Sequence, residues 1–306
     1  MRTRSTPRSS HRSPTTPTKR DGRAITVGEA LASARDRLRS GASARADSAR
    51  LLETILGRDA AWLLAHDRDE VLGADLERYE RALARRGAGE PLAYITGRAG
   101  FYGRAFEVTP DVLVPRPETE GLVDLALAFL RTGAVASPCI GDVGTGSGVL
   151  AVTLACELGA AICTATDISP AALEVGRRNA ARAGVAGRID FVLCDVLPLG
   201  LPGAPFDCIV ANLPYVPSGD LAPPPDPTSF EPRQALDGGP DGLAAYRRLL
   251  EMAPSALARP GLLLMEAGPD TAEPLASLAA LAFSAEATVD IHRDYAGHER
   301  IVAVRS

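Results

Sequence analysis

The residues best suited to chemistry are Asn212-Leu213-Pro214-Tyr215, which directly follow an apolar, strand-like run at 206–211. A planar amide or amino nitrogen carries N–H groups that need acceptors, and two are available here. They are the side-chain oxygen of Asn212 and the backbone carbonyl of residue 213. The Tyr215 ring can pack against the planar group. The segment therefore predicts a catalytic site that orients such a nitrogen for methyl transfer. A plain turn is the alternative, because Asn and Pro are common in turns.

A glycine-rich turn, Gly144-Thr145-Gly146-Ser147-Gly148, lies upstream and follows an apolar run that carries Asp142. Glycines at alternate positions let the backbone turn tightly and approach a ligand closely. A dinucleotide site would show the spacing Gly-x-Gly-x-x-Gly, whereas Gly-x-Gly-x-Gly after an acid is typical of sites for S-adenosyl-L-methionine (SAM). We therefore expect the five turn residues to bind SAM, with an NAD site as the alternative.

Two more acids follow the next two strand-like runs. Asp167 ends the first, where it can accept both ribose hydroxyls, and Asp195 ends the second, where it can meet the adenine amino group. Each alone could cap a helix, and Asp167 precedes a plausible helix start at Ser169-Pro170. Three acids at successive strand ends favour cofactor binding, because ligands of such sheets bind at the carboxyl ends of the strands. Asn212 falls on the same edge and is counted with the cofactor residues.

These residues must be positioned by regular secondary structure. We expect residues 118–306 to form the methyltransferase domain that positions them. Helix-like and strand-like runs alternate there, which predicts an α/β fold with a Rossmann-like, doubly wound sheet. A long Pro-rich loop, 216–235, follows the Asn-Leu-Pro-Tyr segment and predicts a lid or a substrate wall. Helices are expected at 118–131, 147–158, 170–183 and 240–258, and strands at 139–143, 161–166, 188–194, 206–211, 261–266, 287–291 and 300–304.

The preceding residues predict smaller parts. A helical bundle is expected over 24–89, with Thr26 and Glu29 forming a capping box at its first helix. Residues 90–117 interleave Pro and Gly with aromatic and β-branched residues, which predicts a linking β-hairpin. Residues 1–23 hold almost nothing apolar and are expected to be a disordered basic tail. Whether that tail is translated, or touches RNA, stays open.

Composition narrows the class of protein. The 306 residues are 46% hydrophobic, yet no apolar run is long and uncharged enough to suggest a membrane span. The N-terminus lacks the apolar core of a signal peptide. Five cysteines at irregular spacings, mostly within apolar runs, indicate reduced thiols in a cytoplasmic protein. The four histidines show no ligand spacing, so we expect no metal site.

Charge is distributed unevenly along the chain. The first 23 residues carry a net charge of +6 and the whole chain −5, which leaves −11 on the body. Binding along a phosphate backbone needs a basic surface that displaces counterions. We therefore expect no stable nucleic-acid partner, whereas a protein partner is compatible with the acidic body.

With further motifs, these features resemble the protein-(glutamine-N5) methyltransferases that modify peptide chain release factors. These are class I SAM-dependent enzymes with an Asn-Pro-Pro-Tyr motif, and the resemblance covers 24–306. The supporting motifs are Pro91 to Gly97, Phe101-Tyr102-Gly103, Val114 to Glu120, Phe230 to Gly239, Asp241-Gly242-Leu243 and Asp294 to Arg300.

The resemblance implies roles for individual residues. Gly144 to Gly148 and Asp167 would hold SAM, Asp195 would lie near the adenine, and Asn212 to Tyr215 would hold the acceptor. That acceptor would be the glutamine in the Gly-Gly-Gln loop of a class 1 release factor, methylated on its side-chain amide nitrogen. The partner would thus be a protein.

The sequence departs from the family pattern in three places. Leu213 stands where the first proline of the motif is usual. The acceptor there is a backbone carbonyl, so its hydrogen bond can survive, and Pro214 still keeps residue 213 extended, although φ is no longer fixed by a ring. Val196 stands where some relatives have a tryptophan over the adenine, and Pro269-Asp270 replaces a run that is usually polar.

Two other functions stay open. An N6-adenine methyltransferase on DNA or RNA could use the same Asn-x-Pro-Tyr geometry, but the acidic body and the lack of a basic recognition domain count against it. The other is a paralogue that binds SAM or a release factor without turnover, which Leu213 and Val196 motivate.

Overall fold

The computed structural model describes residues 25–38, 42–133, 135–197, 200–223 and 225–306, so the predicted tail lies outside the described residues. The chain divides into two compact units, Met1–Leu83 and Ala84–Ser306. Among the described residues, no helix is long and apolar enough to cross a membrane. Nor do these residues contain a group of three or more His, Cys, Asp or Glu placed to hold a metal ion.

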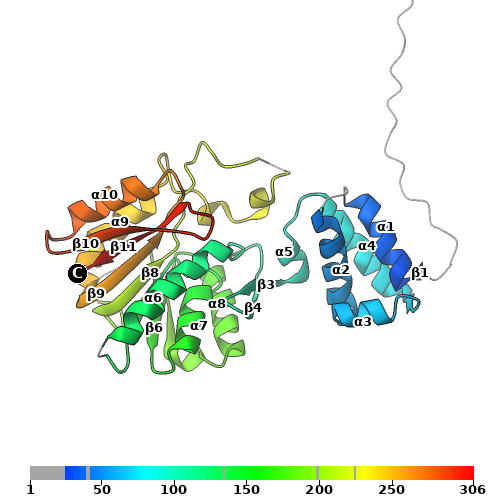
Figure 1. Ribbon diagram of the computed structural model, residues 1–306, viewed down its shortest axis with the longest axis horizontal. Coiled ribbons are helices and arrows are strands. Elements are labelled where there is room, and N and C mark those ends of the chain that lie inside the picture. The colour runs from blue at the N-terminus through cyan, green and yellow to red at the C-terminus, as the bar shows by residue number, and fades with distance from the viewer. Residues whose placement is uncertain (1–24, 39–41, 134, 198–199, 224) are drawn as a thin grey trace, which may run out of the picture. The chain divides into compact units, whose positions relative to one another are not determined.

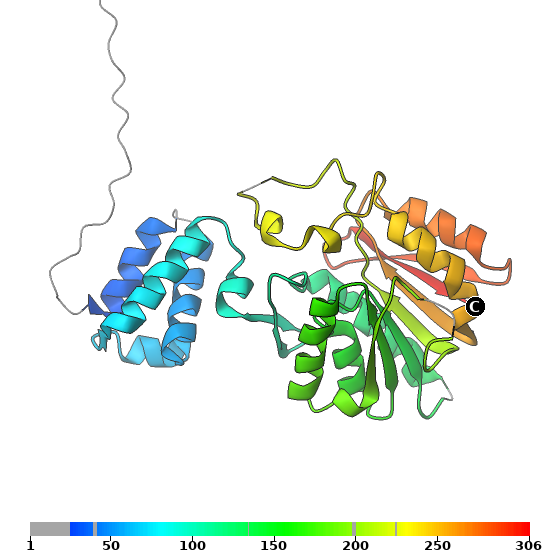
Figure 2. The ribbon, with the colours of Figure 1, turned by 180° about the vertical axis from the view of Figure 1, so that it is seen from behind.

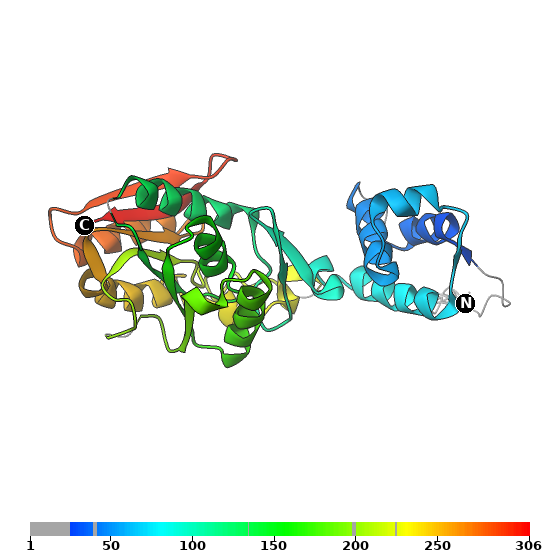
Figure 3. The ribbon, with the colours of Figure 1, turned by 90° about the horizontal axis from the view of Figure 1, so that it is seen from below.

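The N-terminal unit is helical. The predicted capping box is confirmed, because Thr26 Oγ1 accepts from the Glu29 amide and the Glu29 carboxylate accepts from the Thr26 amide. Helix α4 continues past the boundary between the units, so the division into 24–89, 90–117 and 118–306 stays a prediction. Figure 3 shows the elements from blue to cyan: α1 (Val27–Arg37), α2 (Ala42–Leu56), α3 (Ala60–Ala65), α4 (Gly73–Gly87), and the antiparallel pair β1 (Ile25–Thr26) and β2 (Glu70–Val71).

After the end of α4, the larger unit contains a short helix that the Pro and Gly pattern does not predict. This helix, α5 (Leu92–Thr96), starts after Pro91 and ends at Gly97, whose φ of +71° closes it in the left-handed region. The predicted hairpin follows as the antiparallel pair β3 (Arg98–Phe101) and β4 (Arg104–Glu107). The rings of Phe101 and Phe106 pack edge to face and are buried in the main core of the unit.

A seven-stranded sheet in the order β10-β11-β9-β8-β5-β6-β7 forms the centre of the larger unit (Figure 1). From β5 the chain adds β6 and β7 on one side of the sheet, and it then crosses to the other side of β5 to add β8 and β9. This reversal confirms the predicted doubly wound α/β fold. Strands β5 (Cys139–Val143), β6 (Ile162–Asp167), β7 (Ile189–Leu193), β8 (Phe206–Ala211) and β9 (Leu257–Glu266) are parallel, whereas β10 (Thr288–Arg293) and β11 (Glu299–Arg305) pair antiparallel at one edge.

Helices bury both faces of this sheet. On one face lie α6 (Glu120–Thr132), α7 (Val149–Glu157) and α8 (Pro170–Arg182), and on the other α9 (Ala244–Ala256) and α10 (Ala272–Ala282) (Figure 1). The sequence pattern does not predict α10. Strand β9 also begins earlier than predicted, at Leu257, which pairs with Phe206 before an irregularity in the register with β8. The 3-10 turns are η1 (Pro117–Thr119), η2 (Ala186–Arg188), η3 (Pro227–Phe230) and η4 (Arg233–Ala235).

Asn179 joins three parts of the larger unit through one side chain. This residue of α8 is 3% exposed. Its Oδ1 accepts from the Glu107 amide (2.7 Å), and its Nδ2 donates to the carbonyls of Glu107 (3.0 Å) and Ser147 (2.8 Å). The hairpin and the glycine turn are therefore both fixed to α8.

Replacing Asn179 by Ala should destabilise the larger unit by about 2–4 kcal/mol, because buried backbone groups would lose their partners. Arg178→Ala, on the same helix but in a surface ion pair with Glu107, should cost under about 1 kcal/mol. Thermal unfolding followed by circular dichroism measures both. Fluorescence would not, since the single tryptophan, Trp62, lies in the N-terminal unit. Equal shifts for the two variants would contradict this role.

Candidate active site

A cavity of about 860 Å³ opens at the carboxyl ends of β5, β6 and β8. The 216–235 loop contributes Pro232 to Ala235 to its wall and, drawn in yellow, passes over this edge of the sheet (Figure 2). Two predicted residues, Gly148 and Tyr215, do not line the cavity. The structure nevertheless brings the glycine turn and the Asn-Leu-Pro-Tyr segment to one space. Predicted residues on the wall are Gly144, Thr145, Gly146, Ser147, Asp167, Asp195, Asn212, Leu213 and Pro214.

The glycine turn adopts backbone angles that other residues rarely take. φ is +73° at Gly144 and +80° at Gly148. A Cβ at Gly144 would lie 2.7 Å from Cδ2 of Leu213, and one at Gly148 would lie 3.1 Å from Cα of Gly176 in α8. Gly144 therefore lets the turn approach the catalytic segment, whereas Gly148 lets the start of α7 pack closely on α8.

Asp142 supports the turn from within the core. Its Oδ2 accepts hydrogen bonds from Thr145 Oγ1 (2.6 Å) and from the Ala151 amide (3.0 Å). Its Oδ1 is buried without a partner in the part of the chain that the structure describes. Burial raises the pKa of this carboxyl to about 6, against the lowering effect of the two hydrogen bonds. Asp142 thus ties the turn to α7 and does not itself line the cavity.

The two predicted acids on the cavity wall, Asp167 and Asp195, are held in different ways. Asp167 accepts from the Gly146 amide through Oδ2 (2.9 Å) and from the Ser169 amide through Oδ1 (2.8 Å), while burial raises its pKa. Asp195 forms an ion pair with Arg248 of α9, with 3.0 Å between Nε and Oδ2, and both side chains are half exposed. Carboxylate oxygens accept more than one hydrogen bond, so both acids can still bind polar groups of a nucleoside.

The cavity fits SAM by its shape and its polar groups. A Cβ added to Gly146 would meet no atom within 4 Å, so the turn presents bare backbone to open space there. Ile168 is 54% exposed on the same wall and offers an apolar surface for a flat base. Val196, also on the wall, has a φ of +46°, a strained value for a β-branched residue. With Asp167 and Asp195, these residues would hold the cofactor.

Hydrogen bonds fix the first two residues of the catalytic segment. Asn212 donates from Nδ2 to Thr119 Oγ1 (3.1 Å), which leaves its acceptor Oδ1 on the other side of the amide. Leu213 donates its amide to Tyr246 Oη (3.1 Å), and Tyr246 donates in turn to the Glu266 carbonyl. A proline at position 213 would have no N–H. Tyr246 therefore gives the extra donor of leucine a buried partner.

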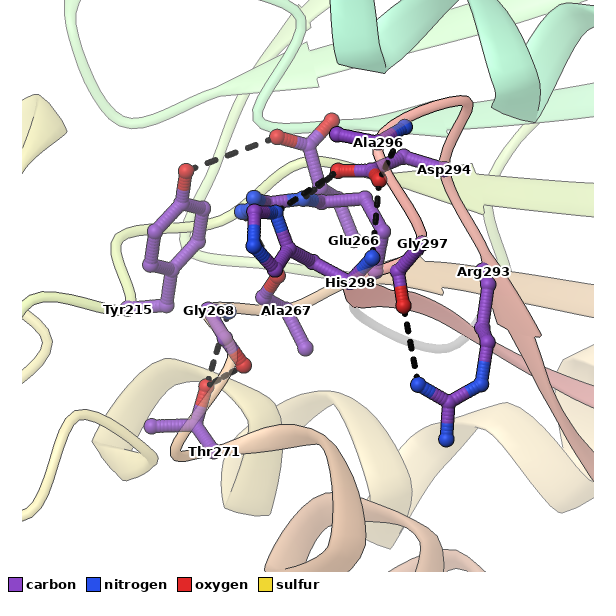
Figure 4. A network of polar contacts seen from close by, with 11 residues as sticks. Tyr215, Glu266, Ala267, Gly268, Thr271, Arg293, Asp294, Ala296, Gly297 and His298 are labelled. Carbon is purple, nitrogen blue, oxygen red and sulfur yellow. Dashed lines mark hydrogen bonds and ion pairs between the residues drawn. The ribbon is translucent and has the colours of Figure 1, made fainter.

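Tyr215 is not among the residues that line the cavity, and Figure 4 shows its hydroxyl directed toward the Glu266 carboxylate. Its hydroxyl points to Glu266 Oε1 at 3.5 Å, and its ring lies against Gly268, where an added Cβ would be 3.3 Å from Cδ2 of the ring. The ring thus packs against the protein itself. Its packing on a planar acceptor stays a prediction.

The structure adds residues that the sequence pattern does not single out. Thr119, Tyr246 and Glu266 contact one another or the Asn-Leu-Pro-Tyr segment. Thr119 lies in the Val114 to Glu120 motif, but no role was predicted for any of the three. Arg116 on the cavity wall pairs with Glu231 of the 216–235 loop (2.7 Å), whose side chain is 1% exposed. In the sequence, this pair could have been suspected from its opposite charges next to prolines, since Arg116 lies in Pro-Arg-Pro and Glu231 in Glu-Pro-Arg.

A double-mutant cycle should reveal the bond between Leu213 and Tyr246. Tyr246→Phe leaves the Leu213 amide buried without an acceptor, which should cost about 1–3 kcal/mol in addition to the loss at the Glu266 carbonyl. In the Leu213→Pro background the first cost disappears, because proline has no N–H. Unfolding free energies of the four proteins should give a coupling of about 1 kcal/mol. Strict additivity would exclude this bond.

Stability should fall with rising pH because of Glu266. Burial is the main cause that raises its pKa, to about 7, above the unfolded value of about 4.3. The folded chain then binds this proton more tightly, so the contribution of Glu266 to stability is fully present below about pH 4.3 and is lost as the pH rises to about 7. Glu266→Gln should remove on the order of 3 kcal/mol of this decline. Melting temperatures at pH 5 and pH 8 measure it, with the exposed Glu251→Gln as control. An unchanged pH dependence in Glu266→Gln would refute the assignment.

Known proteins resemble this chain in sequence and fold. Residues 29–97 match the family described as PrmC N-terminal domain, and 140–223 match the family described as Methyltransferase domain. The chain is 44% identical over 238 residues to the release factor glutamine methyltransferase of Moorella thermoacetica. The aligned segment covers 78% of this chain and 83% of that protein. It is 43% identical over 258 residues to the protein of the same name from Bordetella pertussis. That alignment covers 84% of this chain and 93% of the relative.

A solved structure supports the fold alone. The catalytic domain of hMettl16, in complex with MAT2A 3'UTR hairpin 6, is 13% identical, covers 77% of this chain and 84% of that chain, and has a TM-score of 0.52. The family evidence comes from the sequence relatives, which match most of both chains, and it agrees with the cavity suited to SAM. The chain therefore belongs to the release factor glutamine methyltransferase family and is a SAM-dependent methyltransferase.

Proposed function

We propose that this enzyme methylates the side-chain amide nitrogen, N5, of the glutamine in the Gly-Gly-Gln loop of class 1 peptide chain release factors. The observation that carries the proposal is the position of Asn212 and Leu213 on the wall of the cavity that also contains the glycine turn and Asp167. Acceptor and cofactor can then meet in one space. Release factors act in the cytoplasm, where we expect this protein.

The side chains act by orientation. An amide nitrogen is a weak nucleophile, because its lone pair is delocalised into the carbonyl. Asn212 Oδ1 and the Leu213 carbonyl would accept hydrogen bonds from its two N–H groups and favour pyramidalisation. Bound SAM supplies a methyl group already activated on a sulfonium, so positioning provides most of the catalysis and no strong base is needed.

The 216–235 loop supports a protein substrate. The ion pair of Arg116 and Glu231 anchors this loop beside the cavity, and Pro232 to Ala235 line the wall. A loop with two glycines brings no bulky side chains, so its glutamine could extend to Asn212. The charge of −11 on residues 24–306 disfavours a nucleic-acid substrate.

The test uses the full-length protein, labelled SAM and a recombinant class 1 release factor. Label should appear on the glutamine of the Gly-Gly-Gln loop, located by tandem mass spectrometry, and should be absent when that glutamine is replaced by alanine. Asn212→Ala should lower kcat by about 10²–10³, the usual cost of one oriented partner in the transition state, with SAM affinity changed far less.

Leu213→Pro serves as the matched control within the same segment. Its rate should stay within a few-fold of the natural chain, because the backbone carbonyl remains in both. Label found only on DNA or RNA would instead identify an N6-adenine methyltransferase. SAM binding without transfer to any release factor would identify a paralogue that has lost turnover.

A further inference from the structure

Glu266 is a buried acid beside the catalytic segment that the mechanism above does not use. It ends β9, and the register pairs Ala211 of β8 with Met265 of β9, so Asn212 and Glu266 follow paired residues on adjacent strands. Glu266 is 1% exposed. No donor of good hydrogen-bond geometry reaches its Oε2 from the described residues. Burying a carboxyl with an unpaired oxygen costs stability, so a functional role for Glu266 has to be considered.

Polar and charged groups from several elements face this carboxyl. Tyr215 lies at 3.5 Å from Oε1 (Figure 4), and Thr119 of η1 is the neighbour whose hydrogen bonding most opposes the rise of its pKa. Arg300 of β11 lowers that pKa and Glu118 of η1 raises it. Burial exceeds the other effects and raises the pKa to about 7.

Thr119 is a neighbour of both groups, because its hydroxyl is bonded to Asn212 and its hydrogen bonding lowers the pKa of Glu266. Its hydroxyl already accepts from Asn212 Nδ2 at 3.1 Å, and it has a single hydrogen to donate. An ionised carboxylate only accepts hydrogen bonds. With Glu266 ionised, the Thr119 hydroxyl can only donate to it, so Asn212 would donate to Thr119 and Thr119 to Glu266. The Asn212 amide is then held with Nδ2 toward the protein interior.

We propose that Glu266, acting through Thr119, is a positioning residue that holds the Asn212 amide with its Oδ1 toward the glutamine substrate. This inference rests on the proposed function, since it concerns the acceptor of that reaction. A flipped Asn212 amide would present a donor to the N–H groups of the substrate and could not bind them. A neutral Glu266 carries its own hydrogen and no longer fixes this direction.

The experiment compares Thr119→Val with Thr119→Ser, measuring kcat and KM for a recombinant release factor across pH 5.5 to 9. Valine keeps the shape of threonine and removes the hydroxyl, so kcat should fall about tenfold or more. Serine keeps the hydroxyl and should restore the rate to within about threefold. SAM affinity, measured by calorimetry, should stay unchanged in both. Thr153→Val is the matched control, because Thr153 is buried in α7 and its hydroxyl has no partner among the described residues.

Glu266→Gln gives the second measurement. In the natural chain kcat should rise with pH through an inflection near 7, as Glu266 ionises, and in the glutamine variant that inflection should be absent. The double variant Thr119→Val with Glu266→Gln should have the same kcat as the slower of the two single variants. Both substitutions break the same link between Glu266 and Asn212, so their effects should not add. Circular dichroism checks that each variant is folded.

The outcomes separate this inference from the proposed function. If the natural chain fails to methylate the release factor, the function itself is refuted. If it methylates the factor, but Thr119→Val keeps the natural kcat and Glu266→Gln keeps the natural pH profile, the role of Glu266 is overturned. Loss of rate in Thr119→Val without rescue by Thr119→Ser would also contradict it.

Discussion

The register of three parallel strands is the constraint on which the site depends. Val143 of β5 pairs with Ala211 of β8, and Ala211 pairs with Met265 of β9. The residues that follow are therefore Gly144 at the start of the glycine turn, Asn212, for which we propose the catalytic role, and the buried Glu266. A shift by one residue would turn these side chains to the other face of the sheet. Both faces of these strands are packed, so such a shift would have to repack two close-packed cores at once.

Both halves of the site are built on a buried carboxyl. Asp142 holds the glycine turn and Glu266 lies beneath the catalytic segment, and burial raises the pKa of each, to about 6 and about 7. Each also has one oxygen without a partner in the described residues. Such groups cost stability, but a buried charge also imposes direction on the hydrogen bonds around it. The fold thus gives up some stability for polar groups whose orientation is fixed.

The sequence predicted the features that depend on interactions between residues close together in the chain. The turn, the strand ends and the capping box at Thr26 follow from neighbouring residues, and they could be inferred without a structure. Helix α5 could not, because Pro91 and Gly97 are common in turns as well as at helix ends. Thr119 and Glu266 are 147 residues apart in the sequence, and only the sheet pairing and the packing of η1 place them around Asn212. Contacts of this kind leave no periodicity to detect.

Leu213 shows how such a distant contact can accommodate a change in a motif. The acceptor proposed at this position is a backbone carbonyl, which every residue provides, so the proposed chemistry does not require proline. Leucine brings two additions, a backbone N–H and a longer side chain. Tyr246 accepts the first at 3.1 Å, and the second occupies the space that a Cβ on Gly144 would need. The side chain thereby links the catalytic segment to the cofactor turn. The departure from the family pattern is therefore accommodated within the core, and residue 213 keeps the backbone carbonyl that the proposed function requires.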